Sequence, residues 1–258
     1  MLLLWDINIT MAKYCGGNFL LVTSTFLSAF KNVDWEESQN FIIELMRPLI
    51  GGNRMLGLPH STEVNRRVAK EKLYANAPLA PSARDAIKGQ IDSVVWRNKL
   101  ADSTVGVAAG ETVKEIQVFE VALRQHGLDK GVLPAVAKAI PYKILFVLTY
   151  GGEAQAWMEA AGTFYNTDWL SLEGFTLKFE GLNLDSVYEN LARQIAGGRL
   201  DAEGDIAKAV ERDKRRQRLE REISALEKKI LREKQFNKQV ELNGELRRLR
   251  AELEGLDL

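Results

Sequence analysis

Apolar residues recur at helical spacing in several segments of the chain, and polar capping residues precede them. Ser61 or Thr62 is placed to cap a helix whose first turn contains Glu63, an acidic residue that favours the helix dipole. Ser186 and Glu189 fit a capping box, with Ser186 as the N-cap and Glu189 at position N3. The pattern predicts helices that start at Ser61, run from Ser82 to Ile91, from about Lys130 to Ala139, and from Ser186 to about Ala196.

Runs of β-branched and aromatic residues between these helices predict strands. One run is almost continuously apolar, which is typical of a strand buried on both faces, and two glycines after it predict a hairpin turn. The order of helices and strands predicts an α/β fold of the α+β type, a sandwich built on a mixed sheet. The predicted strands are Ser93–Leu100, Val113–Leu123, Lys143–Tyr150, Ala154–Ala160 and, at an edge, Phe175–Phe179.

The last segment, 205–258, has the clearest local pattern. Leucine and isoleucine residues repeat at alternating spacings of four and three, first over Leu219–Ile230 and then over Leu242–Leu256. Each run is a heptad seam, but the two seams do not share one phase. We therefore expect an antiparallel coiled-coil hairpin with its turn near Phe236 and Asn237, with one long stuttering helix as the alternative.

Composition and charge limit the classes of function. Lys and Arg number 35, as do Asp and Glu, so the chain as a whole is not a basic nucleic-acid binder. The single cysteine, Cys15, and two histidines cannot build a Cys/His zinc site. No apolar run reaches the ~20 residues of a membrane span, and no signal peptide is evident, so we expect a cytoplasmic protein without membrane contact.

The pattern also divides the chain. Residues 1–54 differ in composition from the rest and contain a predicted short helix at Glu36–Met46, and Met55 opens a segment that reads as a fresh start. Either 1–54 is an extra element that packs on the core, or the protein begins at Met55. An α/β core is expected at 55–198, followed by a hinge and the hairpin at 205–258.

One strand carries a candidate catalytic pair. Nucleases of the restriction-enzyme fold place an acid and a lysine two residues apart on a strand, so that both lie on one face and act with a divalent ion. Glu115 and Gln117 have this spacing, and glutamine is a tolerated replacement for the lysine. Asp102 or Asp92 would supply a further acid. The alternative is that Glu115 and Gln117 are polar residues on a half-solvated strand face.

A basic stretch in the predicted hairpin includes Arg215, Arg216 and Arg218. Acidic residues interrupt it, which is typical of a solvated coiled-coil face with ion pairs one turn apart. Contact with nucleic-acid phosphates is the alternative. Together with Phe236 and Asn237 at the predicted turn, these arginines are the candidate partner-binding residues.

The chain from Met55 onward resembles an uncharacterised bacterial and archaeal family, domain of unknown function 4391. The resemblance covers residues 55–256 and implies a setting, because family members tend to lie near helicase and DNA-methyltransferase genes of restriction-type defence systems. It implies no activity and no catalytic residues. It rests on Gly57-Leu58-Pro59, Thr62-Glu63-Val64-Asn65, Trp96 with Lys99-Leu100, Glu115–Glu120, Ile140-Pro141-Tyr142, Asp168-Trp169-Leu170, Gly181–Asp185, Tyr188-Glu189-Asn190, Arg193-Gln194-Ile195, Glu233–Asn237 and Val240–Asn243.

The sequence lacks a phosphate-binding loop, a dinucleotide fingerprint and a nucleophile elbow. We therefore expect an accessory or scaffold subunit of a restriction-type or other DNA-acting defence system. Its hairpin would bind a larger protein, with a helicase or a DNA methyltransferase as candidate partners. The alternative is a divalent-metal nuclease, and only then is a cofactor, Mg²⁺, expected. The sequence leaves the oligomeric state open.

Overall fold

A computed structural model describes residues 56–75, 79–138, 140–173 and 175–256. The chain divides into two units, Met1–Met55 and Leu56–Leu258, and every described residue belongs to the second unit. The predicted helix at Glu36–Met46 and the predicted extension at 1–54 lie outside the described residues. None of the helices within the described part is long and apolar enough to cross a membrane.

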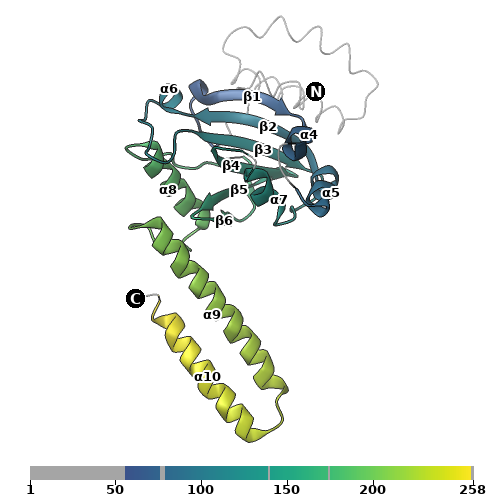
Figure 1. The fold of residues 1–258 in the computed structure, drawn as a ribbon, viewed down its shortest axis with the longest axis vertical. Helices are drawn as coiled ribbons and strands as arrows, with labels where there is room; N and C mark the ends of the chain where they lie inside the picture. The colour runs from purple at the N-terminus through teal and green to yellow at the C-terminus, as the bar shows by residue number, and fades with distance from the viewer. Residues whose placement is uncertain (1–55, 76–78, 139, 174, 257–258) are drawn as a thin grey trace, which may run out of the picture. The chain divides into compact units, whose positions relative to one another are not determined.

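A mixed sheet of seven strands forms the centre of the described unit (Figure 1), as the sequence predicts. Its strand order is β1-β2-β3-β4-β5-β6, and β7 pairs with β5. Only β3 and β4 are parallel, and the other pairs are antiparallel. The strands are β1 (Glu63–Val68), β2 (Ile91–Leu100), β3 (Ile116–Leu123), β4 (Lys143–Tyr150), β5 (Glu153–Ala160), β6 (Thr163–Asn166) and β7 (Leu170–Ser171).

Helices cover both faces of this sheet. On one face, Ile144, Phe146 and Leu148 of β4 join a core cluster with apolar residues of α5 (Pro81–Gln90) and α7 (Val132–Ala137). Because side chains alternate along a strand, Lys143 of β4 points to the other face. There it contacts Tyr188 of α8 (Leu184–Ala196). The short helices η2 (His60–Thr62), α4 (Lys70–Ala75) and α6 (Asp102–Val105) occupy the connections.

The predicted helix from Ser61 is wrong, because Glu63–Val68 forms the edge strand β1 after the single turn of η2. Apolar residues there are four apart, which fits a helix locally. However, β2 offers an unpaired edge, and β1 takes it in an antiparallel ladder. Arg66 and Arg67 stay exposed on this edge strand, where charged side chains discourage pairing with another chain.

The structure also differs from two further predictions, the start of α8 and the edge strand near residue 175. The N-cap of α8 is Asn183 rather than Ser186, which stands at position N3. The Asn183 side-chain oxygen accepts a hydrogen bond from the Ser186 amide, and the Ser186 hydroxyl oxygen accepts one from the Asn183 amide. The helix therefore begins one turn earlier than predicted and ends at Ala196, with Gly197 left-handed as expected. The predicted edge strand Phe175–Phe179 is reduced to one isolated bridge, between Leu56 and Thr176.

The hairpin predicted at the end of the chain is confirmed. Helices α9 (Ile206–Arg232) and α10 (Phe236–Glu254) pack together (Figure 1), and every predicted seam residue is buried or half-buried. The turn lies at residues 233–235, slightly before the predicted position. Glu233 stabilises it, because its carboxylate accepts hydrogen bonds from the amides of Lys234 and Gln235.

Candidate functional site

Glu115 stands at the end of the sheet where β3 begins, and two side chains hold its carboxylate. Lys99 of the neighbouring strand β2 lies 2.7 Å from Oε1. The amide of Gln117 donates to Oε2 at 2.9 Å. Gln117 is only 4% exposed, and its own Oε1 is buried without a partner among the described residues. The structure thus joins the predicted pair Glu115 and Gln117, and it adds Lys99.

Glu115 itself precedes β3, although the predicted strand began at Val113. The reason is Asp185 in the first turn of α8. Its carboxylate accepts hydrogen bonds from the backbone amides of Glu111, Thr112 and Val113 and from the Thr112 hydroxyl. Because Asp185 takes these amides, they are not free to extend the ladder. We call this arrangement the Asp185 clasp.

The clasp changes the chemistry of Asp185. Desolvation raises the pKa of the carboxyl group, but the bonds from the Thr112 side chain and from the amides of Val113, Glu111 and Thr112 together lower that pKa below its ordinary value. The clasp also explains why residue 110 is a glycine, because a Cβ atom at that position would stand 2.3 Å from the Asp185 Cγ. A glycine therefore allows the backbone to approach the carboxylate.

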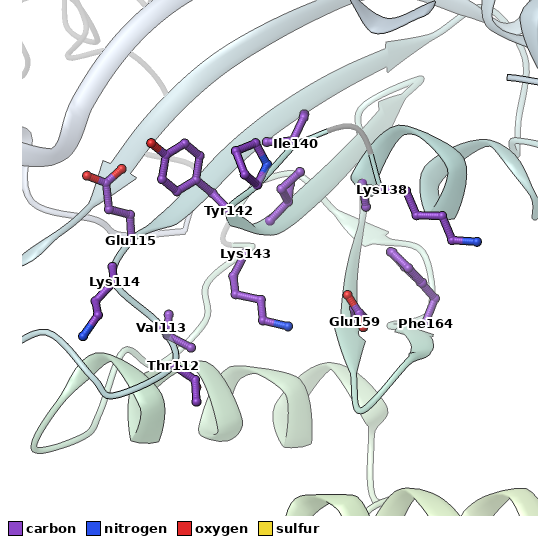
Figure 2. A pocket seen from close by; sticks show the side chains of 13 residues that line it. Thr112, Val113, Lys114, Glu115, Lys138, Ile140, Tyr142, Lys143, Glu159 and Phe164 are labelled. Atoms are coloured by element: carbon purple, nitrogen blue, oxygen red, sulfur yellow. The ribbon is translucent and has the colours of Figure 1, made fainter. Parts of the chain in front are cut away.

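A hollow of about 380 Å³ lies beside this cluster, at the amino ends of the parallel strands β3 and β4. Figure 2 shows the side chains of Glu115, Tyr142, Lys143 and Glu159 among those that surround the hollow. The walls of the hollow come from residues 112–115 next to the Asp185 clasp, the end of α7, the start of β4 and the β5–β6 hairpin. Its charged and aromatic lining residues are Lys114, Glu115, Lys138, Tyr142, Lys143, Glu159 and Phe164.

Asp102, the third residue of the predicted nuclease site, lies in a different segment of the chain from Glu115. It is the first residue of α6, after the end of β2, and it is exposed. Within residues 56–75, 79–138, 140–173 and 175–256, no three His, Cys, Asp or Glu side chains stand close enough together to hold a metal ion. The cluster at the sheet edge is therefore one acid held by a lysine and a glutamine.

The hairpin arginines predicted to bind a partner are engaged within the chain. Arg215 of α9 pairs with Glu252 of α10 at 2.8 Å, and Arg218 pairs with Glu222 one turn later at 2.8 Å. Arg216 lies 4.0 Å from the buried Asp213. Exposed ion pairs of this kind contribute about 0–1 kcal/mol each, so the first two remain easily exchanged for other partners.

Three apolar side chains near the turn of the hairpin are exposed. Leu231 in the last turn of α9 is 85% exposed, and Phe236 at the start of α10 is 75% exposed. Val240 lies one turn after Phe236 on the same side of α10 and is half exposed. Asn237 is exposed beside them. We call Leu231, Phe236 and Val240 the tip patch.

The segment that contains the tip patch is basic. Residues 228–240 contain five Lys and Arg but one acid, Glu233. At 1.5 Å per residue, the end of α9 lies about 28 Å along the helix from Asp213, the residue that contacts β6. The tip patch thus consists of exposed apolar side chains within a basic segment at the far end of the hairpin.

Sequence reasoning did not identify Lys99 as the partner of Glu115, nor the lysines of the hollow. The signal for Lys99 is its antiparallel register opposite Gln117, which requires the strand pairing to be known. Lys114, Lys138 and Lys143 come from three separate segments, and no short motif connects them.

Comparisons with known proteins give one match, and neither curated proteins nor solved structures match the chain. The match is to the family described as Domain of unknown function (DUF4391), and it extends over residues 56–253. It agrees with the resemblance found in the sequence and begins where the described unit begins. The matched residues include nearly all of the sheet, the hollow and the hairpin. The chain therefore belongs to the DUF4391 family.

Proposed function

We propose that the protein is an accessory or scaffold subunit that binds a larger protein through the tip of its C-terminal hairpin. The observation that carries this proposal is the tip patch, where Leu231, Phe236 and Val240 remain exposed. Scattered apolar side chains on a surface need no explanation, but an aromatic residue among aliphatic ones at a rigid helical turn is typical of a binding surface.

The chemistry of the partner follows from that of the tip. The apolar patch requires an apolar hollow on the partner, and the five basic residues around it favour an acidic rim. Burying a leucine or a phenylalanine fully contributes about 1.5–3 kcal/mol each. Leu231 and Phe236 together are therefore sufficient to dominate the affinity of a small interface.

We further propose that the partner is a large DNA-acting protein, with a helicase or a DNA methyltransferase as candidates, and that the complex acts in a cytoplasmic defence system. Support for this setting comes from the family resemblance in the sequence. The hairpin arginines Arg215, Arg216 and Arg218 belong to the proposal only as a secondary contact, because each already has an acidic neighbour in the chain.

The test is capture of partners from the native host with the full chain as bait, followed by binding measurements with the purified partner. The tip variant carries Leu231→Ala and Phe236→Ala, and the matched control is Leu182→Ala, which alters a leucine that is 95% exposed outside the hairpin. We expect the tip variant to weaken binding at least about thirtyfold and the control to leave it unchanged. Equal affinity of the tip variant and the wild type would contradict the proposal.

A second candidate function is a divalent-metal nuclease centred on Glu115. The observation that favours it is the cluster of Glu115, Gln117 and Lys99 beside the hollow. Coordination of a cation would require the Glu115 carboxylate to leave Lys99. The cation would also need further oxygen ligands, which Asp102 of α6 or a substrate would supply.

An assay of the purified chain with Mg²⁺ or Mn²⁺ on DNA and on RNA separates the two functions. The diagnostic variant is Glu115→Ala, and the control is Glu111→Ala, an exposed acid four residues earlier. Cleavage that Glu115→Ala abolishes and Glu111→Ala preserves would overturn a purely structural role. Absence of cleavage in the wild type would remove the nuclease candidate.

A further inference from the structure

The hollow at the amino ends of β3 and β4 has an excess of positive charge. Lys114, Lys138 and Lys143 line it together with two acids, Glu115 and Glu159. Lys99 already neutralises the Glu115 carboxylate at 2.7 Å. The remaining charged residues of the lining are three lysines and one glutamate, an excess of two positive charges that favours an anionic ligand.

Two of these lysines are held in place without losing their capacity to bind. The ammonium group of Lys114 donates to the carbonyl of Gly110 at 2.7 Å, and Lys143 lies over the Tyr188 ring, 5.2 Å from its centre. An ammonium group has three donors, so each retains hydrogen atoms for a ligand oxygen. Lys138 is exposed at the end of α7.

Two aromatic side chains also line the hollow. The ring of Tyr142 lines it while 48% of the residue is exposed, and the half-buried Phe164 lines it from β6. Aromatic rings beside lysines offer a stacking platform to a planar base and charge to a phosphate. The volume of about 380 Å³ falls within the range of roughly 300–1,000 Å³ that is usual for small-molecule sites.

The acid in the hollow restricts what can bind. Glu159 Oε1 accepts a hydrogen bond from the amide of Gly162 at 3.1 Å, and Glu159 lines the hollow together with Lys143 (Figure 2). A carboxylate repels a bare phosphate but accepts hydrogen bonds from hydroxyl groups. The ligand therefore combines an anionic end with hydroxyl donors and a planar ring.

We propose that this hollow binds a nucleoside monophosphate, with its phosphate at the lysines, its sugar hydroxyls toward Glu159 and its base against Tyr142. The Asp185 clasp fixes the wall that carries Lys114, so that this wall is formed before the ligand arrives. The site is independent of the hairpin and of the partner proposed for it.

The experiment is calorimetric titration of the full chain with adenosine 5′-monophosphate, adenosine and inorganic phosphate. We expect the monophosphate to bind at least tenfold more tightly than either fragment, with an affinity that falls as salt is raised. Lys138→Ala and Lys143→Met should each weaken this binding about fivefold to tenfold. Lys130→Ala, an exposed lysine outside the hollow, should leave it unchanged.

Tyr142→Ala should reduce affinity for the monophosphate while leaving that for inorganic phosphate unchanged. Thermal unfolding of each variant checks that the fold is retained. No binding of the monophosphate at millimolar concentration would overturn the proposal, as would equal binding of adenosine or an equal loss in Lys130→Ala. Binding of inorganic phosphate as tight as that of the monophosphate would overturn the role of the ring.

Discussion

The phenol of Tyr165 on β6 donates a hydrogen bond of 2.8 Å to the carboxylate of Asp213 on α9, and both side chains are buried. The pair joins the sheet to the base of the hairpin across 48 residues of sequence. Gln217 donates to the same Asp213 oxygen at 2.9 Å, and the guanidinium of Arg199 lies 5.1 Å from the centre of the Tyr165 ring. The hairpin is thus anchored to the sheet through a buried polar contact.

Replacing Tyr165 with Phe should destabilise the protein by about 1.5–3 kcal/mol, because it removes a hydrogen bond to a buried charged group. Urea unfolding of the full chain measures this change. The comparison is Tyr142→Phe, since that tyrosine is exposed and its substitution should change stability by less than about 0.5 kcal/mol. Equal effects of the two substitutions would show that the Tyr165 bond does not stabilise the fold.

The contribution of Tyr165 should fall at high pH. Burial raises the pKa of its phenol above the ordinary value of 10.0, and the hydrogen bond to Asp213 with its negative charge raises it further. The neutral phenol therefore stabilises the folded state fully below pH 10. This stability is lost as pH rises toward the folded pKa, because the unfolded chain ionises first. The stability difference between wild type and Tyr165→Phe should narrow above pH 10 in urea unfolding.

The Asp185 clasp gives the opposite pH dependence. Asp185→Asn should lower the free energy of unfolding by about 1–2 kcal/mol at neutral pH, since four hydrogen bonds lose their charged acceptor. The folded pKa of Asp185 is below its ordinary 3.8. Its contribution is therefore present above that value and lost as pH falls through the folded pKa. A difference that persists unchanged at pH 2–3 would contradict this account.

The close approach of Gly110 to Asp185 predicts that Gly110→Ala and substitutions of Asp185 are not additive. In the wild-type background the new Cβ would stand 2.3 Å from the Asp185 Cγ, so the carboxylate has to move and lose its bonds. In an Asp185→Ala background the same methyl group has space. We expect Gly110→Ala to cost at least about 1 kcal/mol less there, measured by a double-mutant cycle.

Gln117→Met should change stability by less than about 1 kcal/mol, because two effects oppose each other. The substitution removes a buried carbonyl oxygen that has no partner among the described residues, but it also removes the amide hydrogen bond to Glu115 Oε2. The control is Gln155→Met. The Gln155 amide donates to the Thr167 carbonyl at 2.8 Å, and its oxygen accepts from Trp157 at 2.7 Å. That substitution should cost about 2 kcal/mol. A similar loss for Gln117→Met would mean that its oxygen is satisfied in solution.

Leu226→Ala should loosen the hairpin, whereas Leu231→Ala should not. Leu226 lies in the seam and is 8% exposed, and Leu231 at the tip is 85% exposed. Truncation of a buried leucine costs about 2–5 kcal/mol, and the lower end applies to a seam between two helices. Hydrogen exchange of α10 amides should accelerate in the first variant alone. Faster exchange in the second would assign Leu231 a role in folding rather than in binding.

The local sequence pattern was sufficient to predict an element where that element's own residues determine its structure. Strand β4 has the predicted bounds, Lys143–Tyr150, because its continuous apolar run is stable only when buried on both faces. The hairpin follows from its two heptad seams, since each seam buries its leucines only against the other. The end of α8 at Gly197 follows from the left-handed conformation that glycine adopts there.

Tertiary structure decided the features that depend on partners distant in sequence. Glu63–Val68 became strand β1 because the edge of β2 offered it a ladder, overriding a helical pattern. Glu115 stands outside β3 because Asp185, more than 70 residues away, holds the amides before it. Lys99 meets Glu115 only through the pairing of β2 with β3. Hydrophobic periodicity shows which face of an element is buried. The contacts of polar groups depend instead on which elements become neighbours, and only the tertiary packing determines those neighbours.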